Sequence, residues 1–252
     1  AEWEVMALGG RWPDPVWMYT QSMASRSTPV PLMYYRKGDR WQRKLNKEGP
    51  LLWSYAAFAA WTDGRVLALR TLTPAAGDLS ELSPGKQKQV LAALAASPPR
   101  IDVLAPGAAP APAPLQLAPG SRPRSLVATT SGEVFVLSFV DGEAPVAILE
   151  QFAPGSSTGT REPLDRVGAR STALTSGRLL ARGDAVYLVG SAVDQPGLVL
   201  RRDGPRWQPT PPLPRPLRSL AVGPEATLWA ILEDQDAEGE PFGTLYKRTG
   251  EA

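Results

Sequence analysis

Five short segments of the chain share one pattern, in which turn residues precede an apolar run with an aromatic or other large residue at the fifth position. They are PDPVWMY at 13–19, DGRVLAL at 63–69, SGEVFVL at 131–137, GDAVYLV at 183–189 and EATLWAI at 225–231. Each follows another short apolar run, at 6–8, 55–61, 125–129, 179–182 and 217–222, the fourth being the weakest. Two such runs joined by Asp-Gly, Ser-Gly or Gly-Asp are typical of a β-hairpin, because these residues accept positive φ. The pattern predicts five hairpins.

A third run, ending in charged residues, follows each hairpin. It is clearest at 31–41, 197–207 and 243–252, and weaker near 101–104 and 146–150. Trp41 and Trp207 each stand three residues after a glycine, and we expect a fourth strand to begin there. The repeat unit is therefore predicted to be a four-stranded antiparallel meander.

The spacing of the repeats predicts the fold class. The copies begin at 13, 63, 131, 183 and 225, so the intervals are 50, 68, 52 and 42 residues. A four-stranded unit of about 40–50 residues is the blade of a β-propeller. We expect an all-β protein, with residues 1–252 forming a single five-bladed β-propeller of four-stranded antiparallel blades. The Ala/Pro tract at 105–119 is interpreted as a loop within this domain, since it is in register with the loop at 208–216.

The one long interval contains SPGKQKQVLAALAASPP at 83–99. Ser83 is suited to a helix N-cap, Pro84 to the first helical position, and Pro98-Pro99 to a helix stop. The segment predicts a helical insertion near 84–96, on the outside of the second blade.

The C-terminal part of the chain resembles known propeller repeats. The pattern LRRDGPRW…PRPLRSLAVGPEATLWAIL…GTLYKR, between 200 and 248, is similar to bacterial propellers of the tectonin and tachylectin kind, and to WD-like propellers. The resemblance covers about two of the five units. It implies a propeller fold and, for the tectonin branch, binding to a sugar or a surface.

Composition excludes much chemistry. The 252 residues include no Cys and no His. Disulfides, thiolate nucleophiles, zinc fingers and Ser-His-Asp triads are therefore excluded. The longest apolar stretch, 51–61, is eleven residues and falls short of the roughly 18 needed to span a membrane. The bias toward Ala, Pro, Gly, Arg and Leu indicates a GC-rich bacterial gene. The compartment stays open, with an extracytoplasmic (periplasmic or secreted) location slightly favoured.

Three segments match the sequence motifs of known catalytic or metal sites but lack other residues that those sites need. The GSSTG run at 155–159 matches a nucleophile elbow, but the chain has no His to act as base. Ser83 and Lys86 have SxxK spacing without its companion motifs, so Ser83 is interpreted as a helix cap. The acidic tip at 234–240 resembles the start of a calcium loop, but its ninth and twelfth positions are Phe242 and Leu245. We expect no catalytic residue, no metal site and no cofactor.

Basic and aromatic residues recur together around the start of the expected fourth strands. The candidate binding residues are Arg40, Trp41, Arg43, Arg206 and Trp207. Interleaved cations and rings can hold an anionic polymer by charge and stacking. The alternative is structural, because charged outer strands discourage edge pairing between molecules.

These observations favour a non-catalytic propeller that acts as a protein-interaction module or scaffold subunit. The expected partner is another protein or a larger complex. A lectin-like, polysaccharide-binding propeller is the alternative, and a carboxylate-based glycoside hydrolase or lyase is a third possibility. The formal net charge is only +2, but the pI near 9.0 leaves a nucleic-acid or anionic-polymer partner open. Nucleic acid is the less favoured partner. A lectin should repeat the same polar residues in each unit, whereas an enzyme should cluster carboxylates at the channel.

Overall fold

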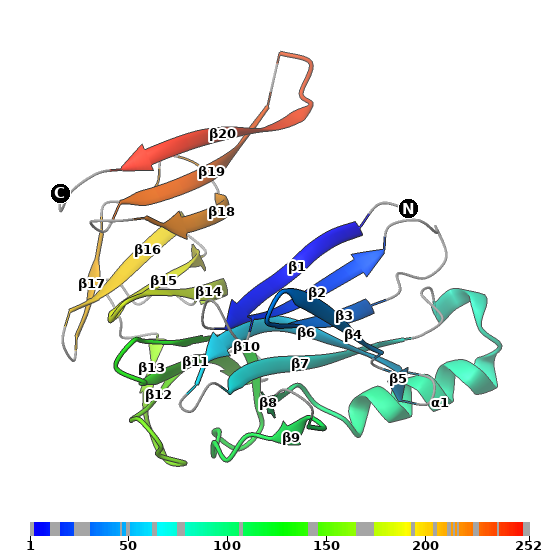
Figure 1. The fold of residues 1–252 in the computed structure, drawn as a ribbon. Helices are drawn as coiled ribbons and strands as arrows, with labels where there is room; N and C mark the ends of the chain where they lie inside the picture. Colours follow the sequence, from blue (N-terminus) through cyan, green and yellow to red (C-terminus); the bar gives the residue numbers. More distant parts are fainter. Residues whose placement is uncertain are drawn as a thin grey trace. The chain divides into compact units, whose positions relative to one another are not determined.

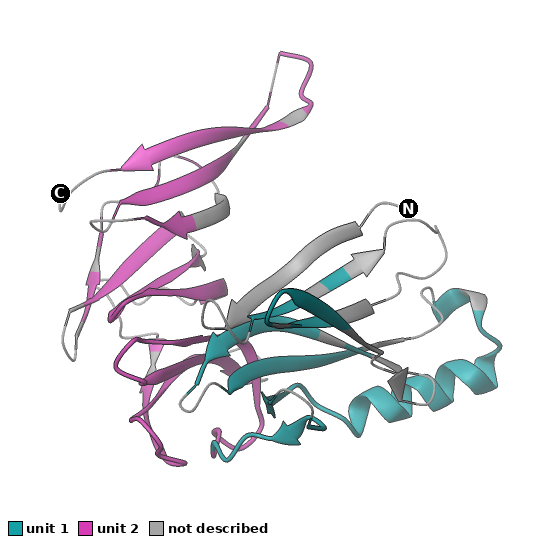
Figure 2. Cartoon of the chain, viewed as in Figure 1, with its two compact units in different colours: residues 1–115 teal, residues 116–252 magenta. Residues whose placement is uncertain are grey.

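The structure is a computed structural model built almost entirely of β-strands (Figure 1). It describes residues 3–10, 16–22, 31–45, 47–48, 51–61, 65–74, 79–105, 108–140, 146–164, 174–192, 195–203, 206–210, 213, 215, 217–223, 227–235 and 237–248. The chain divides into two compact units, residues 1–115 and 116–252 (Figure 2). That both units form one domain over residues 1–252 stays a prediction.

Unit 1 contains the first two blades. Blade 1 is the sheet β1 (Trp3–Gly10), β2 (Val16–Ser22), β3 (Pro31–Lys37) and β4 (Arg40–Leu45). Blade 2 is the sheet β5 (Lys47–Glu48), β6 (Leu51–Ala60), β7 (Val66–Pro74), β8 (Arg100–Leu104) and β9 (Ala111–Pro112). Between β7 and β8 lie a 3-10 helix, η2 (Leu79–Glu81), and the helix α1 (Pro84–Ala95).

Unit 2 contains three blades. Blade 3 is β10 (Ser121–Ala128), β11 (Val134–Val140), β12 (Val146–Phe152) and β13 (Gly159–Pro163). Blade 4 is β14 (Leu174–Arg182), β15 (Ala185–Ala192), β16 (Gln195–Asp203) and β17 (Arg206–Pro209). Blade 5 is β18 (Leu217–Val222), β19 (Leu228–Gln235) and β20 (Pro241–Arg248).

These sheets confirm the predicted fold class, an all-β five-bladed β-propeller. Every blade is an antiparallel meander, and its second long strand begins inside one of the five repeated segments. The expectation of four strands per blade holds for blades 1, 3 and 4. Blade 2 has five strands, because the two-residue strand β5 adds to the open side of β6, and the described part of blade 5 has three.

The cores lie between neighbouring blades of the same unit. In unit 1, Trp17 of blade 1 packs with Tyr55 and Val66 of blade 2. In unit 2, one cluster joins blades 3 and 4 and a second joins blades 4 and 5. Second strands such as 134–138 are buried at consecutive positions. Their continuous apolar runs follow from this packing, because both faces of the strand are covered.

The first long strand of each blade (β1, β6, β10, β14 and β18) contains a β-bulge that the apolar pattern did not predict. The register of its pairing with the next strand shifts between residues 5 and 7, 55 and 57, 123 and 125, 174 and 176, and 217 and 219. A bulge adds one residue, bends the strand and re-aims the side chains beside it. The recurrence of this irregularity in all five blades makes it a feature of the repeat.

The predicted helix is confirmed. Helix α1 spans Pro84–Ala95, contacts β6 and β7, and buries Val90. Ser83 occupies the N-cap position as expected, but its side chain makes no capping hydrogen bond. Within the described residues, no helix is long and apolar enough to cross a membrane.

Candidate binding site

The first strands of unit 2 are rich in arginine. β10 contains Arg122 and Arg124, β14 contains Arg178 and Arg182, and β18 contains Arg218. None of these three strands contains an acidic residue. Neighbouring first strands contact one another, β10 with β14 and β14 with β18, so the arginines come from adjacent strands. These arginines are visible in the sequence, inside the segments SRPRS, SGRLLAR and LRS. The sequence alone does not show that the three strands are neighbours, so it does not show that the arginines come together.

Arg124 and Arg178 lie beside the hydrogen bond that joins blade 3 to blade 4. The backbone N–H of Leu179 donates to Ser125 Oγ at 2.8 Å. Along β10, Pro123 and Ser125 are buried and Arg122 and Arg124 are exposed. Arg124 is the additional residue of the bulge in β10. The bulge therefore places an exposed arginine immediately before the residue that contacts β14.

The Arg178 guanidinium is partly buried. Its Nη2 is inaccessible to solvent and has no hydrogen-bond partner among the described residues. Burial lowers the pKa of Arg178 below its usual value, because a charged group loses hydration there. Arg182, on the same strand, has a structural contact instead, since its Nη1 donates to the carbonyl of Val222 in blade 5 at 3.1 Å. Of the arginines on β10 and β14, Arg124 is exposed, Arg178 is partly buried, and both stand next to the hydrogen bond that joins the two strands.

A second feature of unit 2 is a pocket of about 510 Å³ between the outer strands of blades 3 and 4. It is lined by residues of β12, β13, β16 and β17: Leu149, Gln151, Thr160, Arg161, Glu162, Arg202 and Trp207. By strand register, Thr160 and Glu162 share a face of blade 3 with Gln151 and Leu149, whereas Arg161 pairs with Glu150 on the opposite face.

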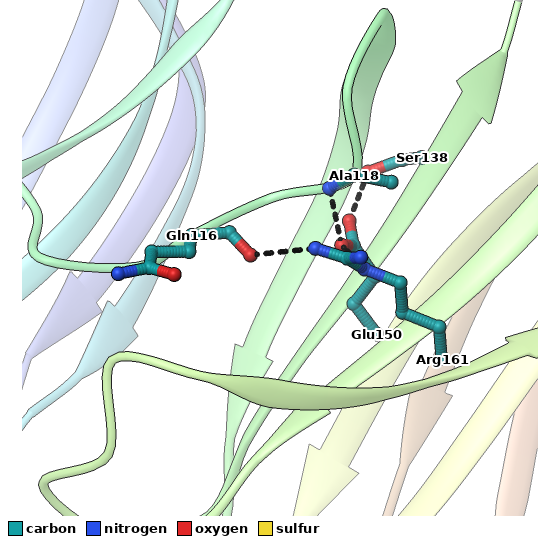
Figure 3. Close-up of polar contacts among 5 residues, drawn as sticks. All are labelled: Gln116, Ala118, Ser138, Glu150 and Arg161. Atoms are coloured by element: carbon teal, nitrogen blue, oxygen red, sulfur yellow. Dashed lines mark hydrogen bonds and ion pairs between the residues drawn. The ribbon is translucent and has the colours of Figure 1, made fainter.

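On that opposite face of blade 3, the buried carboxylate of Glu150 accepts hydrogen bonds from several groups (Figure 3). Its Oε1 accepts hydrogen bonds from the backbone N–H of Ala118 at 2.7 Å and from Arg161 Nε at 3.3 Å, and its Oε2 accepts one from Ser138 Oγ at 3.1 Å. Arg161 Nη2 also donates to the carbonyl of Gln116 at 3.2 Å. These bonds attach the end of the Ala/Pro tract to blade 3 and hold Arg161 in one place.

Unit 1 contains a different buried polar cluster, on β6, β7 and β8 of blade 2. Asp102 is fully buried, with Arg100 Nε at 2.8 Å from its Oδ1 and Arg70 Nε at 3.8 Å from its Oδ2. Burial raises the pKa of Asp102 more than the two arginines lower it. Burial, and then the negative charge of Asp102, also raises the pKa of the Tyr55 hydroxyl. The cluster holds one buried carboxylate and no second one that could complete an acid/base pair.

The five residues predicted to bind fall into two groups in different units. On β4 of unit 1, Arg40 and Trp41 are exposed, Trp41 to 45%. The side chains of Arg43, also on β4, and of Arg206, which begins β17, lie outside the described residues. Trp207 is 9% exposed, packs in the core between blades 3 and 4, and lines the pocket. The binding role of all five stays a prediction.

The GSSTG run and the acidic tip form hydrogen bonds and ion pairs within the protein. In the turn between β12 and β13, Ser156 Oγ donates to the carbonyl of Thr158 at 2.6 Å. In the acidic tip, Asp234 forms an ion pair with Arg215 and accepts a hydrogen bond from Thr244 Oγ1 at 3.2 Å. Asp236 lies outside the described residues. The part of the chain that the structure describes holds no group of three or more acidic side chains close enough to bind a metal ion.

Comparison with known proteins adds support for the fold. No protein-family model and no curated protein matches the chain. The structure is similar to a protein of unknown function from Dyadobacter fermentans, with a TM-score of 0.55 and 10% identity over 96% of this chain and 78% of that one.

Two further solved structures have lower TM-scores. One is a gluconolactonase from Xanthomonas campestris (TM-score 0.49, 11% identity, 96% of this chain and 85% of that one). The other is YCF48 bound to a D1 peptide (TM-score 0.45, 12% identity, 96% and 69%). The similar structures thus include an enzyme and a peptide-binding protein. At such identities the likeness shows the fold alone, and the specific resemblance to tectonin-like or WD-like repeats stays a prediction.

Proposed function

We propose that this protein is a non-catalytic β-propeller that acts as a protein-interaction module or scaffold subunit. Its contact surface is the arginine-bearing part of β10 and β14, and its partner is an acidic segment of another protein. The observation that carries the proposal is the arginine content of these two strands, which contain no acidic residue. The exposed Arg124 precedes Ser125 and Arg178 precedes Leu179, the two residues whose hydrogen bond joins the strands, and Arg178 Nη2 lacks a hydrogen-bond partner among the described residues.

Physical chemistry supports an anionic partner at this place. A partly buried cation without a counter-charge destabilises the fold, and a carboxylate brought by a partner would offset that cost. Guanidinium groups bind carboxylates through paired hydrogen bonds. The small formal net charge of +2 favours a short acidic segment over a long polyanion.

The same strands support a non-catalytic role. The five first strands β1, β6, β10, β14 and β18 contain one acidic residue in total, Glu4. Glycoside hydrolysis by carboxylates uses a pair that flanks the scissile bond. A single acid on these strands provides no such pair.

The test is peptide binding to the full chain, measured by fluorescence anisotropy. The probe is a labelled ten-residue peptide of alternating Glu and Asp, and the matched peptide contains Gln and Asn at the same positions. We expect only the acidic peptide to bind, with an affinity that falls as salt rises. Arg124→Ala and Arg178→Met should each weaken binding about tenfold.

Two controls separate binding from folding. Lys88→Ala removes an exposed positive charge from α1 and should leave the affinity unchanged. Arg178→Met keeps most of the side-chain volume and removes a desolvated charge, so its melting temperature should not fall. Equal binding of both peptides, or an equal loss in Lys88→Ala, would overturn the proposal.

A further inference from the structure

The outer edge of blade 5 differs from the outer edges of the other blades. Blade 5 ends at β20, the last strand of its sheet in Figure 1. Within the described residues, no strand pairs with the side of β20 that faces away from β19. The backbone N–H and C=O groups of an edge strand form a template on which another strand can pair.

The outermost strands of blades 1–4 contain residues that oppose such pairing. β9, β13 and β17 are two to five residues long and each contains a proline, and β4 contains three basic residues in six. Proline, positive charge and short length are the usual means by which edge strands avoid pairing between molecules. In β20, which has eight residues, the proline comes first and Lys247 and Arg248 come last. The five residues 242–246 between them contain no proline and no charge.

Apolar side chains on β20 are exposed. Phe242 is 45% exposed and Leu245 is 66% exposed. Leu245 pairs with Ile231 of β19, which lies on the same face of the sheet and is 39% exposed. Exposed apolar side chains along an uncharged edge strand indicate a surface that another chain covers.

The register of β20 makes the strand complementary to itself. When two β20 strands lie antiparallel about Leu245, each Leu245 faces the other. Arg248 of one copy then faces Phe242 of the second copy, because each lies three residues from Leu245. The apolar face continues from Ile231 through both Leu245 side chains to Ile231 of the second copy.

Blades 1 and 4 contain the same pairing of an arginine with an aromatic residue inside one chain. Arg36 of β3 pairs with Trp41 of β4, and Arg202 of β16 pairs with Trp207 of β17. Arg248 stands at the equivalent place in β20. A second copy would thus bring, through its phenylalanine, the aromatic residue that the fourth strand brings in these two blades. A guanidinium close to an aromatic ring adds attraction.

The two ends of β20 also match in charge. Lys247 and Arg248 stand at its end, and the exposed Glu238 and Glu240 precede its beginning. In an antiparallel pair, the beginning of one strand lies beside the end of the other, so opposite charges come together at both ends. This complementarity favours a second copy of the chain over an unrelated strand.

We propose that β20 binds β20 of a second copy, antiparallel and centred on Leu245, so that two fifth blades form one continuous sheet. The same patch on both copies gives a closed two-fold dimer, which leaves neither edge unpaired. The proposal does not depend on acidic-peptide binding by Arg124 and Arg178.

Sedimentation equilibrium of the full chain tests the dimer. We expect a monomer–dimer equilibrium with a dissociation constant of about 1–100 µM, because the pairing of single strands makes a small interface. Leu245→Lys places two positive charges opposite each other and should weaken the dimer more than about tenfold. The matched control, Leu91→Lys, changes a leucine of α1 that is 53% exposed and should leave the dimer unchanged.

A disulfide tests the register. The chain has no Cys, so Leu245→Cys introduces one thiol per copy. Residues directly opposite each other in an antiparallel pair have Cα atoms about 4.5–5.5 Å apart, which a disulfide can span. With oxidised glutathione as the oxidant, Leu245→Cys should form a covalent dimer much faster than Leu91→Cys does.

Three results would overturn the proposal: a chain that stays monomeric at about 1 mM, well above the expected dissociation constant, a dimer that Leu245→Lys leaves intact, and equal cross-linking of the two Cys variants. A melting temperature of dilute Leu245→Lys equal to that of the unmodified chain would show that the variant is folded. Leu245→Lys should also bind the acidic peptide normally, and Arg124→Ala should still dimerise. Failure of the dimer can thus be distinguished from failure of the proposed protein-binding function.

Discussion

Two buried carboxylates, Asp102 in blade 2 and Glu150 in blade 3, occupy the same register position in their blades. Asp102 pairs with Ala68 on β7, and Glu150 pairs with Val136 on β11. Ala68 and Val136 are each the sixth residue of a repeated segment. Both carboxylates have no exposed surface. The equivalent residues in blades 1, 4 and 5 are Tyr34, Leu200 and Tyr246.

The surroundings of the two carboxylates differ. Glu150 accepts hydrogen bonds from a backbone N–H, a hydroxyl and a guanidinium. Asp102 accepts one from Arg100, and its Oδ2 accepts none among the described residues, although Arg70 lies 3.8 Å away. Burial raises the pKa of Asp102, and the charges of Arg100 and Arg70 lower it by less.

The residue opposite each carboxylate on the next strand explains part of this difference. Glu150 stands opposite Arg161 on β13, whereas Asp102 stands opposite Pro112 on β9. Proline has no backbone N–H and no polar side chain, so it offers no donor. The hydrogen bonds that a carboxylate receives at this buried position therefore depend on which donors the neighbouring strand brings.

The largest expected effect is that of Glu150→Leu. The substitution leaves the buried Ser138 hydroxyl and the Ala118 N–H without their acceptor, so the free energy of unfolding should fall by about 3 kcal/mol. Urea unfolding of the full chain measures this. Glu162→Leu, an exposed position two strands from β11, should change it by less than about 0.5 kcal/mol. Equal effects of the two variants would show that the Glu150 hydrogen bonds do not stabilise blade 3.

Arg161→Ala should have a smaller effect, because this partner of Glu150 is half-exposed and its ion pair is screened by solvent. We expect a loss of about 1 kcal/mol in the same unfolding assay. The backbone N–H of Ala118 and the hydroxyl of Ser138 still bind Glu150 in this variant. A loss as large as that of Glu150→Leu would mean that Arg161 alone compensates the buried charge.

Asp102→Asn should have the smallest effect at neutral pH, with no loss of stability beyond about 1 kcal/mol. Because the folded pKa of Asp102 is raised, its stabilising contribution is fully present below the unfolded pKa and is lost as pH rises through the folded pKa. From pH 7 to pH 4, the intact chain should therefore gain stability relative to Asp102→Asn. Melting temperatures of both proteins across this range provide the measurement. A difference that stays constant with pH would show that Asp102 does not titrate differently on folding.

The sequence by itself determined the number of blades, the position of the second strand in each blade, and the helix at 84–95. These features depend on local pattern, since a strand covered on both faces must be apolar along its length and a turn must contain residues that accept its φ angles. The candidate residues Trp41 and Trp207 show where local pattern stops being informative. Both were expected at the start of a fourth strand, and both are there, but one side chain is exposed and the other packs between blades.

Only the tertiary structure decided which polar residues meet. The bulges of the first strands, the pairing of Glu150 with Arg161, and the neighbouring positions of Arg124 and Arg178 all depend on the register between strands. The contacts between blades 3 and 4 also involve segments about fifty residues apart, as in the bond from Leu179 to Ser125. A one-residue change of register turns a side chain to the opposite face of its sheet, so a buried ion and an exposed one have the same local sequence pattern.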